Sequence, residues 1–158
     1  MCNTVLWIAV IVISVALDRI TKWLAVLYLK GNGSVSIIGE LLHFTYVENE
    51  GAAFGMMKNA RWIFMVISTL AIGAMIFYLI KYKPKSRLAL VSLAMIIGGG
   101  IGNMIDRVLL GYVVDFIYIK IIDFAVFNVA DAFVCVGTAL LIIYIIFLYR
   151  DGKDGAKK

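Results

Sequence analysis

The sequence predicts an all-α membrane protein, a four-transmembrane-helix bundle with a small extracytoplasmic β-sheet and both termini in the cytoplasm. First, 63% of the 158 residues are hydrophobic and only 16% are charged, whereas a soluble domain carries more charge and fewer apolar residues. Second, four apolar runs each approach the roughly 20 residues that cross a bilayer core. Third, basic residues cluster directly beside these runs.

The four predicted spans cover about residues 5–29, 62–82, 88–110 and 128–149. The first has no basic N-terminal region and no small-residue cleavage site, so we expect a retained helix and not a signal peptide. We expect one integral membrane domain over residues 1–158, with a disordered tail at residues 150–158.

The positions of the positive charges predict the orientation. The two clusters are Lys81, Lys83, Lys85 and Arg87 between the second and third spans, and Arg150, Lys153, Lys157 and Lys158 in the tail. Four crossings place both clusters on one side of the membrane, and the positive-inside rule makes that side the cytoplasm. The net charge of +5 is thereby explained without a nucleic-acid partner.

The remaining connections, at about residues 30–61 and 111–127, then face outward. The first is too long for a simple turn, which indicates a function or a structure of its own. Within it, SVSII and LLHFTYV are rich in β-branched and aromatic residues and lie between GNGS and ENEG. This pattern predicts a small sheet on the outer surface.

Ionisable and amide side chains within the apolar spans gather near the outer membrane interface. They are Asp18, Lys22, Asn103, Asp106, Arg107, Asn128 and Asp131, with Asp115 in the outer connection just before the last span. Such groups are costly in lipid and commonly mark function. Because scattered structural residues would not sort to one depth, this level predicts a functional site.

Structural interpretations of the polar residues in the first and third spans remain open. Asp18 and Lys22 are four residues apart on one helix face, so they can form a neutralised pair that only stabilises packing. Asn103 beside an ion pair of Asp106 and Arg107 can anchor its helix at the interface, although burial of such groups favours function. The preceding run GGGIG can let helices approach closely.

Asn128 opens the stretch FNVAD at the start of the last span. Its side chain can cap that helix by accepting hydrogen bonds from free backbone amides. Capping and a role in catalysis are compatible, since a cap near a site also fixes the geometry of that site.

Asp115 and Asp131 are the strongest candidates for chemistry. They are too distant in sequence to share a helix face, yet both belong at the outer end. Two carboxylates that meet in a partly dry site share a proton. One can then act as a base that activates water and the other as an acid, and which of them holds the proton stays open.

Other catalytic chemistries fit the sequence poorly. The only histidine, His43, lies among apolar residues of the outer loop, and neither HExxH nor GxSxG is present. We therefore expect no metal site, no cofactor and no serine nucleophile, and we interpret His43 as a strand residue. Asp123 is a rival member of the carboxylate pair, or an interfacial loop residue.

The sequence resembles the lipoprotein signal peptidases, also called signal peptidase II, over essentially its whole length. The matching segments are DRITK (18–22), NEGAAFG (49–55), GGGIGNMIDR (98–107), VVDF (113–116) and FNVAD (127–131), in the order of that family. Each segment is weak evidence alone, and five in register are specific. The stretch IYIKIIDFAV before FNVAD is shorter than in many relatives, which bears on how substrate is admitted.

The resemblance implies an aspartic endopeptidase of the bacterial cytoplasmic (inner) membrane, with its active site facing the outer leaflet. It implies cleavage of diacylglyceryl-modified prolipoproteins before the lipidated cysteine, and inhibition by cyclic peptides of the globomycin type. By motif, Asp115 and Asp131 would be catalytic. The positions that would line the site or contact substrate are Asn49, Asn103, Arg107 and Asn128, and those of architectural type are Asp18, Lys22 and Asp106. The outer loop would form the family's β-cradle on the membrane.

Two other classes compete with this interpretation. A proton-coupled transporter or channel component would use the carboxylates as relay groups, and should show midplane sites or inverted repeats. A purely structural bundle would leave the common depth of the polar residues unexplained.

Overall fold

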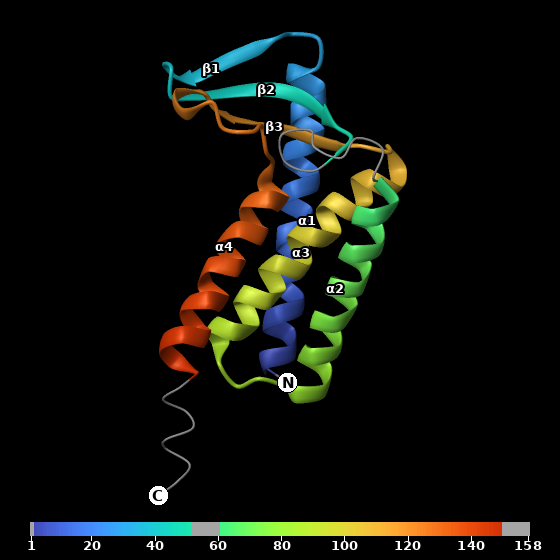
Figure 1. Cartoon of the computed structure of the whole chain (residues 1–158), viewed down its shortest axis with the longest axis vertical. Coiled ribbons are helices and arrows are strands. Elements are labelled where there is room, and N and C mark those ends of the chain that lie inside the picture. Colours follow the sequence, from blue (N-terminus) through green and yellow to red (C-terminus); the bar gives the residue numbers. More distant parts are fainter. Residues whose placement is uncertain (1, 52–60, 150–158) are drawn as a thin grey trace, which may run out of the picture.

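The computed structural model describes residues 2–51 and 61–149, which form a helix bundle with a sheet at one end (Figure 1). The four long helices are α1 (Cys2–Leu29), α2 (Arg61–Tyr82), α3 (Arg87–Leu109) and α4 (Val129–Ile143), the last continued by a π-helical turn, η3 (Tyr144–Leu148). All four are long and apolar enough to cross a membrane. The predicted bundle of four apolar helices of membrane-spanning length is therefore confirmed, and the tail at 150–158 lies outside the described residues.

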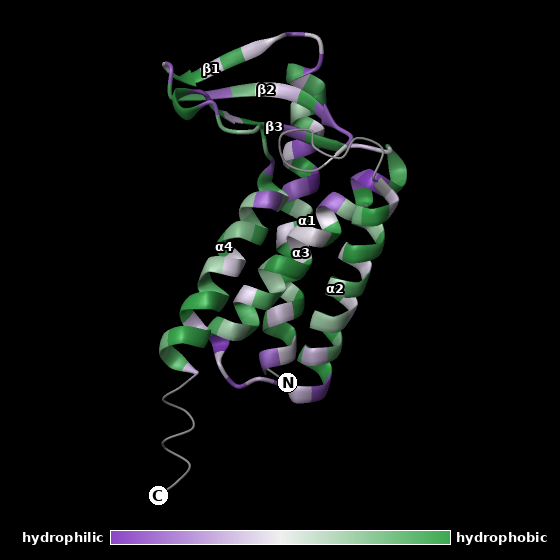
Figure 2. Cartoon of the chain, viewed as in Figure 1, coloured by the Kyte–Doolittle hydropathy of each residue, from purple (hydrophilic) through white to green (hydrophobic). Residues whose placement is uncertain are grey.

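The start of α1, the connection between α2 and α3 and the end of α4 lie at the end of the bundle opposite the sheet (Figure 1). Most residues of the helices between the two ends are hydrophobic (Figure 2). Large side chains such as Trp23, Leu70 and Phe77 are more than half exposed there. A surface of this kind is expected where helices face lipid.

Helix α3 is the centre of the bundle and contacts α1, α2 and α4. In its most apolar stretch 50% of the residues are buried, compared with 11% or less in the other three helices. Glycines on α3 allow this packing: a Cβ added to Gly98 would lie 2.6 Å from the Cβ of Ser14, and one added to Gly102 would lie 2.6 Å from Oδ2 of Asp18. The close approach expected of GGGIG is therefore present.

The sheet has three antiparallel strands in the order β1 (Ser34–Ile38), β2 (Leu42–Asn49) and β3 (Val113–Ile119). The sequence predicted a sheet from residues 30–61 alone, and this prediction was incomplete. Strand β3 comes from the second outer connection and covers the edge of β2 that a two-stranded sheet would leave unpaired. As a result Asp115 lies on a strand, opposite Val47, and not in an irregular loop.

Apolar contacts hold the sheet on the bundle. Ala25 and Leu29 at the end of α1 form a buried cluster with Val114 and Phe116 of β3. The rings of Phe116 and Phe44 meet edge to face, with centroids 5.8 Å apart. Strand β3 is thus fixed to both β2 and α1.

Candidate active site

A cavity of about 410 Å³ lies where the sheet meets α3 and α4. Its polar lining residues are Asn49, Asn103, Arg107, Asp115 and Asp131. Its apolar lining comes from β3, from residues 124–127 and from the first turns of α4, including Phe127 and Ala132. These five predicted site residues therefore meet in one place, at the end of the bundle that carries the sheet, whereas Asn128 is fully buried and does not line the cavity.

Asp115 is only 2% exposed and projects from β3. Its Oδ2 accepts a hydrogen bond from Nδ2 of Asn49 at 2.8 Å, and its Oδ1 accepts one from Nδ2 of Asn128 at 2.6 Å. Burial raises the pKa of Asp115 from 3.8 to about 6, and the charge of Asp131 adds to this effect, whereas the two hydrogen bonds oppose it. Asp115 is therefore able to hold a proton near neutral pH.

Asp131 belongs to the first turn of α4, where it forms a capping box with Asn128. Oδ1 of Asn128 accepts a hydrogen bond from the backbone N–H of Asp131 at 2.9 Å, and Oδ2 of Asp131 accepts one from the N–H of Asn128 at 3.2 Å. Oδ1 of Asp131 accepts a further bond from Nδ2 of Asn103 at 2.7 Å. The cap thus holds the backbone and side chain of Asp131 together.

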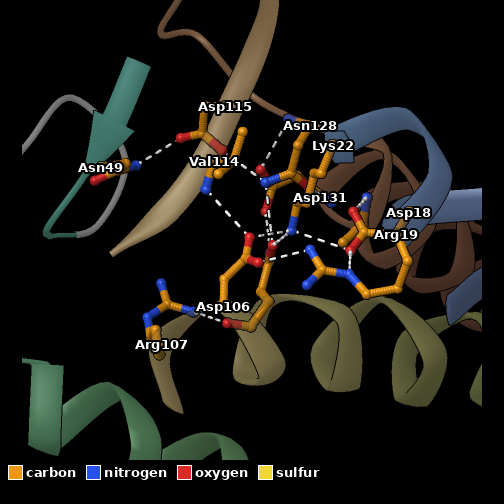
Figure 3. Close-up of polar contacts among 12 residues, drawn as sticks. Asp18, Arg19, Lys22, Asn49, Asp106, Arg107, Val114, Asp115, Asn128 and Asp131 are labelled. Carbon is orange, nitrogen blue, oxygen red and sulfur yellow. Dashed lines mark hydrogen bonds and ion pairs between the residues drawn. The ribbon is translucent and has the colours of Figure 1, made fainter. Parts of the chain in front are cut away.

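Two amides link the two carboxylates (Figure 3). Asn128, which is fully buried, contacts Asp115 through its side chain and Asp131 through the capping box. Its Nδ2 also donates to Oδ1 of Asn103 at 3.1 Å, and Asn103 in turn donates to Asp131. Strand β3 and helices α3 and α4 are therefore joined by one hydrogen-bonded network at the cavity.

Four charged side chains, hereafter the charge cluster, lie beneath this network: Asp18, Arg19 and Lys22 of α1 and Asp106 of α3 (Figure 3). Nζ of Lys22 lies 3.0 Å from Oδ2 of Asp18 and 2.9 Å from Oδ2 of Asp106. It also donates to Oδ1 of Asn103 at 2.7 Å. The charge cluster is thus connected directly to an amide that holds Asp131.

The two carboxylates of the charge cluster also bind the backbone beside the catalytic candidates. Oδ2 of Asp106 accepts from the N–H of Val114 at 3.1 Å, and Oδ1 of Asp18 accepts from the N–H of Ala130 at 3.2 Å. Val114 directly precedes Asp115 and Ala130 directly precedes Asp131. Asp18, Lys22 and Asp106 therefore support the site from below, and they do not line the cavity.

The ion pair expected between Asp106 and Arg107 was wrong. Asp106 pairs with Arg19 at 2.6 Å and with Lys22, because adjacent residues of a helix point to different faces. Arg107 lines the cavity, donates to the carbonyl oxygen of Asn103 at 3.5 Å and lies over Phe64, 5.6 Å from its ring centroid. Sequence reasoning overlooked Arg19, although it stands inside DRITK next to Asp18.

The two remaining polar candidates lie away from the carboxylate pair. His43 is a residue of β2, paired with Ser36 and Tyr118, as expected, and its ring contacts Ser34 and the carbonyl oxygen of Gly39. Asp123 is exposed at the end of the short helix η2 (Lys120–Ile122) and accepts a hydrogen bond from Tyr118 at 2.6 Å. Within NEGAAFG, residues 52–55 lie outside the described part of the chain.

Comparisons with known proteins show to which family the chain belongs. A family model described as signal peptidase (SPase) II matches residues 10–147. The lipoprotein signal peptidase of Caldanaerobacter subterraneus subsp. tengcongensis is 48% identical over 140 residues, which cover 89% of this chain and 95% of the relative. That of Geobacillus kaustophilus is 44% identical over 149 residues, covering 93% of this chain and 96% of the relative.

The fold is similar to a solved structure described as a bacterial membrane enzyme, determined by the in meso method at 2.3 Å resolution. The TM-score is 0.84 at 32% sequence identity, and the match covers 96% of this chain and 92% of the other. A second such structure, at 1.9 Å, has a TM-score of 0.81 at 33% identity and covers 90% of this chain and 93% of the other. Sequence and fold thus lead to the same result: the chain belongs to the signal peptidase II family.

Proposed function

We propose that this chain is a membrane aspartic endopeptidase that removes signal peptides from prolipoproteins, with Asp115 and Asp131 as its catalytic pair. The observation that carries the proposal is the shared cavity, in which both carboxylates are joined through Asn128. Family membership supports the substrate class, since the relatives that match over most of the chain are lipoprotein signal peptidases.

In the proposed reaction the two carboxylates share one proton. The ionised carboxylate removes a proton from water while the water oxygen attacks the scissile carbonyl carbon, and the protonated carboxyl gives its proton to the carbonyl oxygen. The resulting tetrahedral intermediate breaks its C–N bond as the leaving nitrogen gains a proton from the pair. The other carboxylate then recovers a proton from a hydroxyl group, so the pair ends with one proton as it began.

The raised pKa of Asp115, about 6, supports placing the shared proton on Asp115 in the resting enzyme. Asp131 would then be the base. Asn103 and the capping box direct hydrogen-bond donors at Asp131 and so hold its carboxylate in place at the cavity. Asn49 and Arg107 line the same cavity and would contact the substrate backbone.

The finer substrate is a prolipoprotein that already carries a diacylglyceryl group, cut just before the lipidated cysteine. A lipid anchor would hold the scissile bond at the membrane surface, the depth at which the polar side chains gather. The basic cluster at residues 81–87 supports a cytoplasmic position for the opposite end of the bundle, so that the cavity faces the outer leaflet of the bacterial inner membrane. Cyclic peptides of the globomycin type should bind in this cavity.

The test is a cleavage assay in detergent on a diacylglyceryl-modified prolipoprotein, with wild type, Asp131→Asn and Asp123→Asn. We expect cleavage before the lipidated cysteine by wild type and by Asp123→Asn, and no cleavage by Asp131→Asn. Asp123 is the matched control because it is an exposed carboxylate near the same outer end.

Two outcomes would contradict the proposal. Cleavage by Asp131→Asn at the wild-type rate would move the chemistry away from Asp115 and Asp131. Absence of cleavage by correctly folded wild type would remove the peptidase assignment itself and favour a transport role for the carboxylates.

A further inference from the structure

We propose that Arg19 is a positioning residue for the catalytic pair: it orients Asp106, and through Asp106 the strand that carries Asp115, and it neutralises the charge cluster beneath the site. This inference rests on the proposed peptidase function. It adds a residue that the motif comparison does not single out.

The geometric step runs through the two oxygens of Asp106. Oδ1 of Asp106 receives Nη2 of Arg19 at 2.6 Å. This leaves Oδ2 for Nζ of Lys22 at 2.9 Å and for the backbone N–H of Val114 at 3.1 Å. Asp115 follows Val114 directly. The orientation of the Asp106 carboxylate therefore fixes the position of the backbone from which the Asp115 side chain projects.

The electrostatic step follows from the charges of the cluster. Two carboxylates, Asp18 and Asp106, are balanced by two cations, Arg19 and Lys22. Both carboxylates and Lys22 are almost completely buried, so solvent screens them poorly. The charge of Lys22 already lowers the pKa of Asp115, which means that the field of the cluster reaches the site. Removing Arg19 would leave one uncompensated negative charge there.

Arg19 differs from its partners in that its side chain is 31% exposed. It can therefore be changed without leaving an empty space in the core, while Lys22 keeps its pair with Asp18. Arg19 is also absent from the described lining of the cavity that holds Asp115 and Asp131. Its influence on the reaction has to pass through other residues.

Besides Arg19, the charged groups of the described chain around the cluster and the catalytic pair are Asp18 and Lys22 of α1, Asp106 and Arg107 of α3, Asp115 of β3 and Asp131 of α4. An added negative charge among them raises the pKa of Asp115 further. The pH dependence of cleavage should therefore move to higher pH when Arg19 loses its charge.

The experiment measures kcat and KM for the lipidated prolipoprotein from about pH 5 to pH 9, alongside thermal unfolding in detergent. Arg19→Gln keeps an amide donor but loses the charge. We expect kcat to fall about tenfold with KM unchanged, and the pH profile to move upward by about one unit. Arg19→Lys restores the charge, so its profile should match wild type, with kcat only partly recovered because the forked guanidinium is absent.

Two further variants make the test specific. In the double variant Arg19→Gln, Asp106→Asn the cluster is neutral again, and the pH profile should return to the wild-type position. Lys30→Gln is the matched control, since Lys30 is a cation of the same end of the protein, half exposed and paired with Glu48 at 2.9 Å. A surface pair of this kind contributes little, so kcat, KM and the profile should not change.

The inference is overturned if wild type cleaves and Arg19→Gln changes only the melting temperature, with kcat and the pH profile as in wild type. It is also overturned if only KM changes, because Arg19 would then act in binding. If Arg19→Gln does not fold, Arg19→Lys decides: an unchanged kcat excludes the orienting role. A wild type that cleaves nothing refutes the peptidase function instead.

Discussion

Asn128 donates a hydrogen bond from its buried Nδ2 to Oδ1 of Asp115 at 2.6 Å, while its Oδ1 caps the first turn of α4. One side chain therefore joins the first turn of helix α4 to strand β3 of the sheet. The two proposed catalytic carboxylates come from these two elements. Their relative position depends on an amide that is itself fixed by helix geometry.

Replacing Asn128 with alanine should reduce both stability and activity. Loss of the cap costs about 0.5–2 kcal/mol, and Asp115 loses a donor at one oxygen. We expect kcat to fall by about 100-fold, since small displacements of catalytic groups have effects of this size. Cleavage rates and detergent melting curves measure the two effects separately.

The control for this variant is Ser86→Ala. Ser86 caps α3 at the opposite end of the bundle, where its hydroxyl accepts from the N–H of Ala89 at 3.3 Å. The Ser86→Ala variant should have a lower melting temperature than wild type and an unchanged kcat. An equal loss of activity in both variants would show that the effect of Asn128 is only one of stability.

The thermal stability of wild type should fall as pH rises from about 4 to about 6. Burial raises the pKa of Asp115 from 3.8 to about 6, so the folded protein binds this proton more tightly than the unfolded chain. The tighter binding of this proton adds to the free energy of unfolding below about pH 4. This contribution is lost as the pH rises through the pKa of Asp115 in the folded protein. The difference is at most about 3 kcal/mol.

Asp115→Asn should remove this part of the pH dependence, because an amide does not titrate. It should also be inactive while remaining folded and inserted. Melting temperatures of wild type, Asp115→Asn and Asp123→Asn over the same pH range provide the comparison. If the melting temperature of Asp115→Asn still falls with rising pH as in wild type, the titration belongs to another group.

The elements were largely predictable from the sequence, because apolar length and charge placement determine membrane spans. The third strand was not, since VVDFIYI is short and its partner β2 lies more than 60 residues earlier. Pairing across such a separation depends on how α1 and α3 bring the two connections together. Residue composition alone does not contain that information.

In the site, too, some contacts could be predicted from the sequence and others could not. The pair of Asp18 and Lys22 follows from helix periodicity and is found at 3.0 Å. The bonds from Asp106 to Val114 and from Asp18 to Ala130 involve backbone N–H groups, which every residue but proline carries and which sequence patterns therefore cannot mark. Arg19 could have been suspected only from the need to balance a second buried carboxylate.

A methyl group at Gly102 should damage the site, although glycine is usually the weaker helix former. The added Cβ would lie 2.6 Å from Oδ2 of Asp18 and 3.3 Å from the Cβ of Ala130. Asp18 is held by Lys22 and by the N–H of Ala130, so it cannot move away without shifting the start of α4. Gly102→Ala should therefore lower stability by about 1–3 kcal/mol and reduce kcat.

Gly73→Ala on α2 is the control, because no atom of the described residues lies within 4 Å of its added Cβ. It should leave cleavage unchanged and keep or slightly raise the melting temperature; equal behaviour of the two variants would contradict the tight packing of α1, α3 and α4 at Gly102.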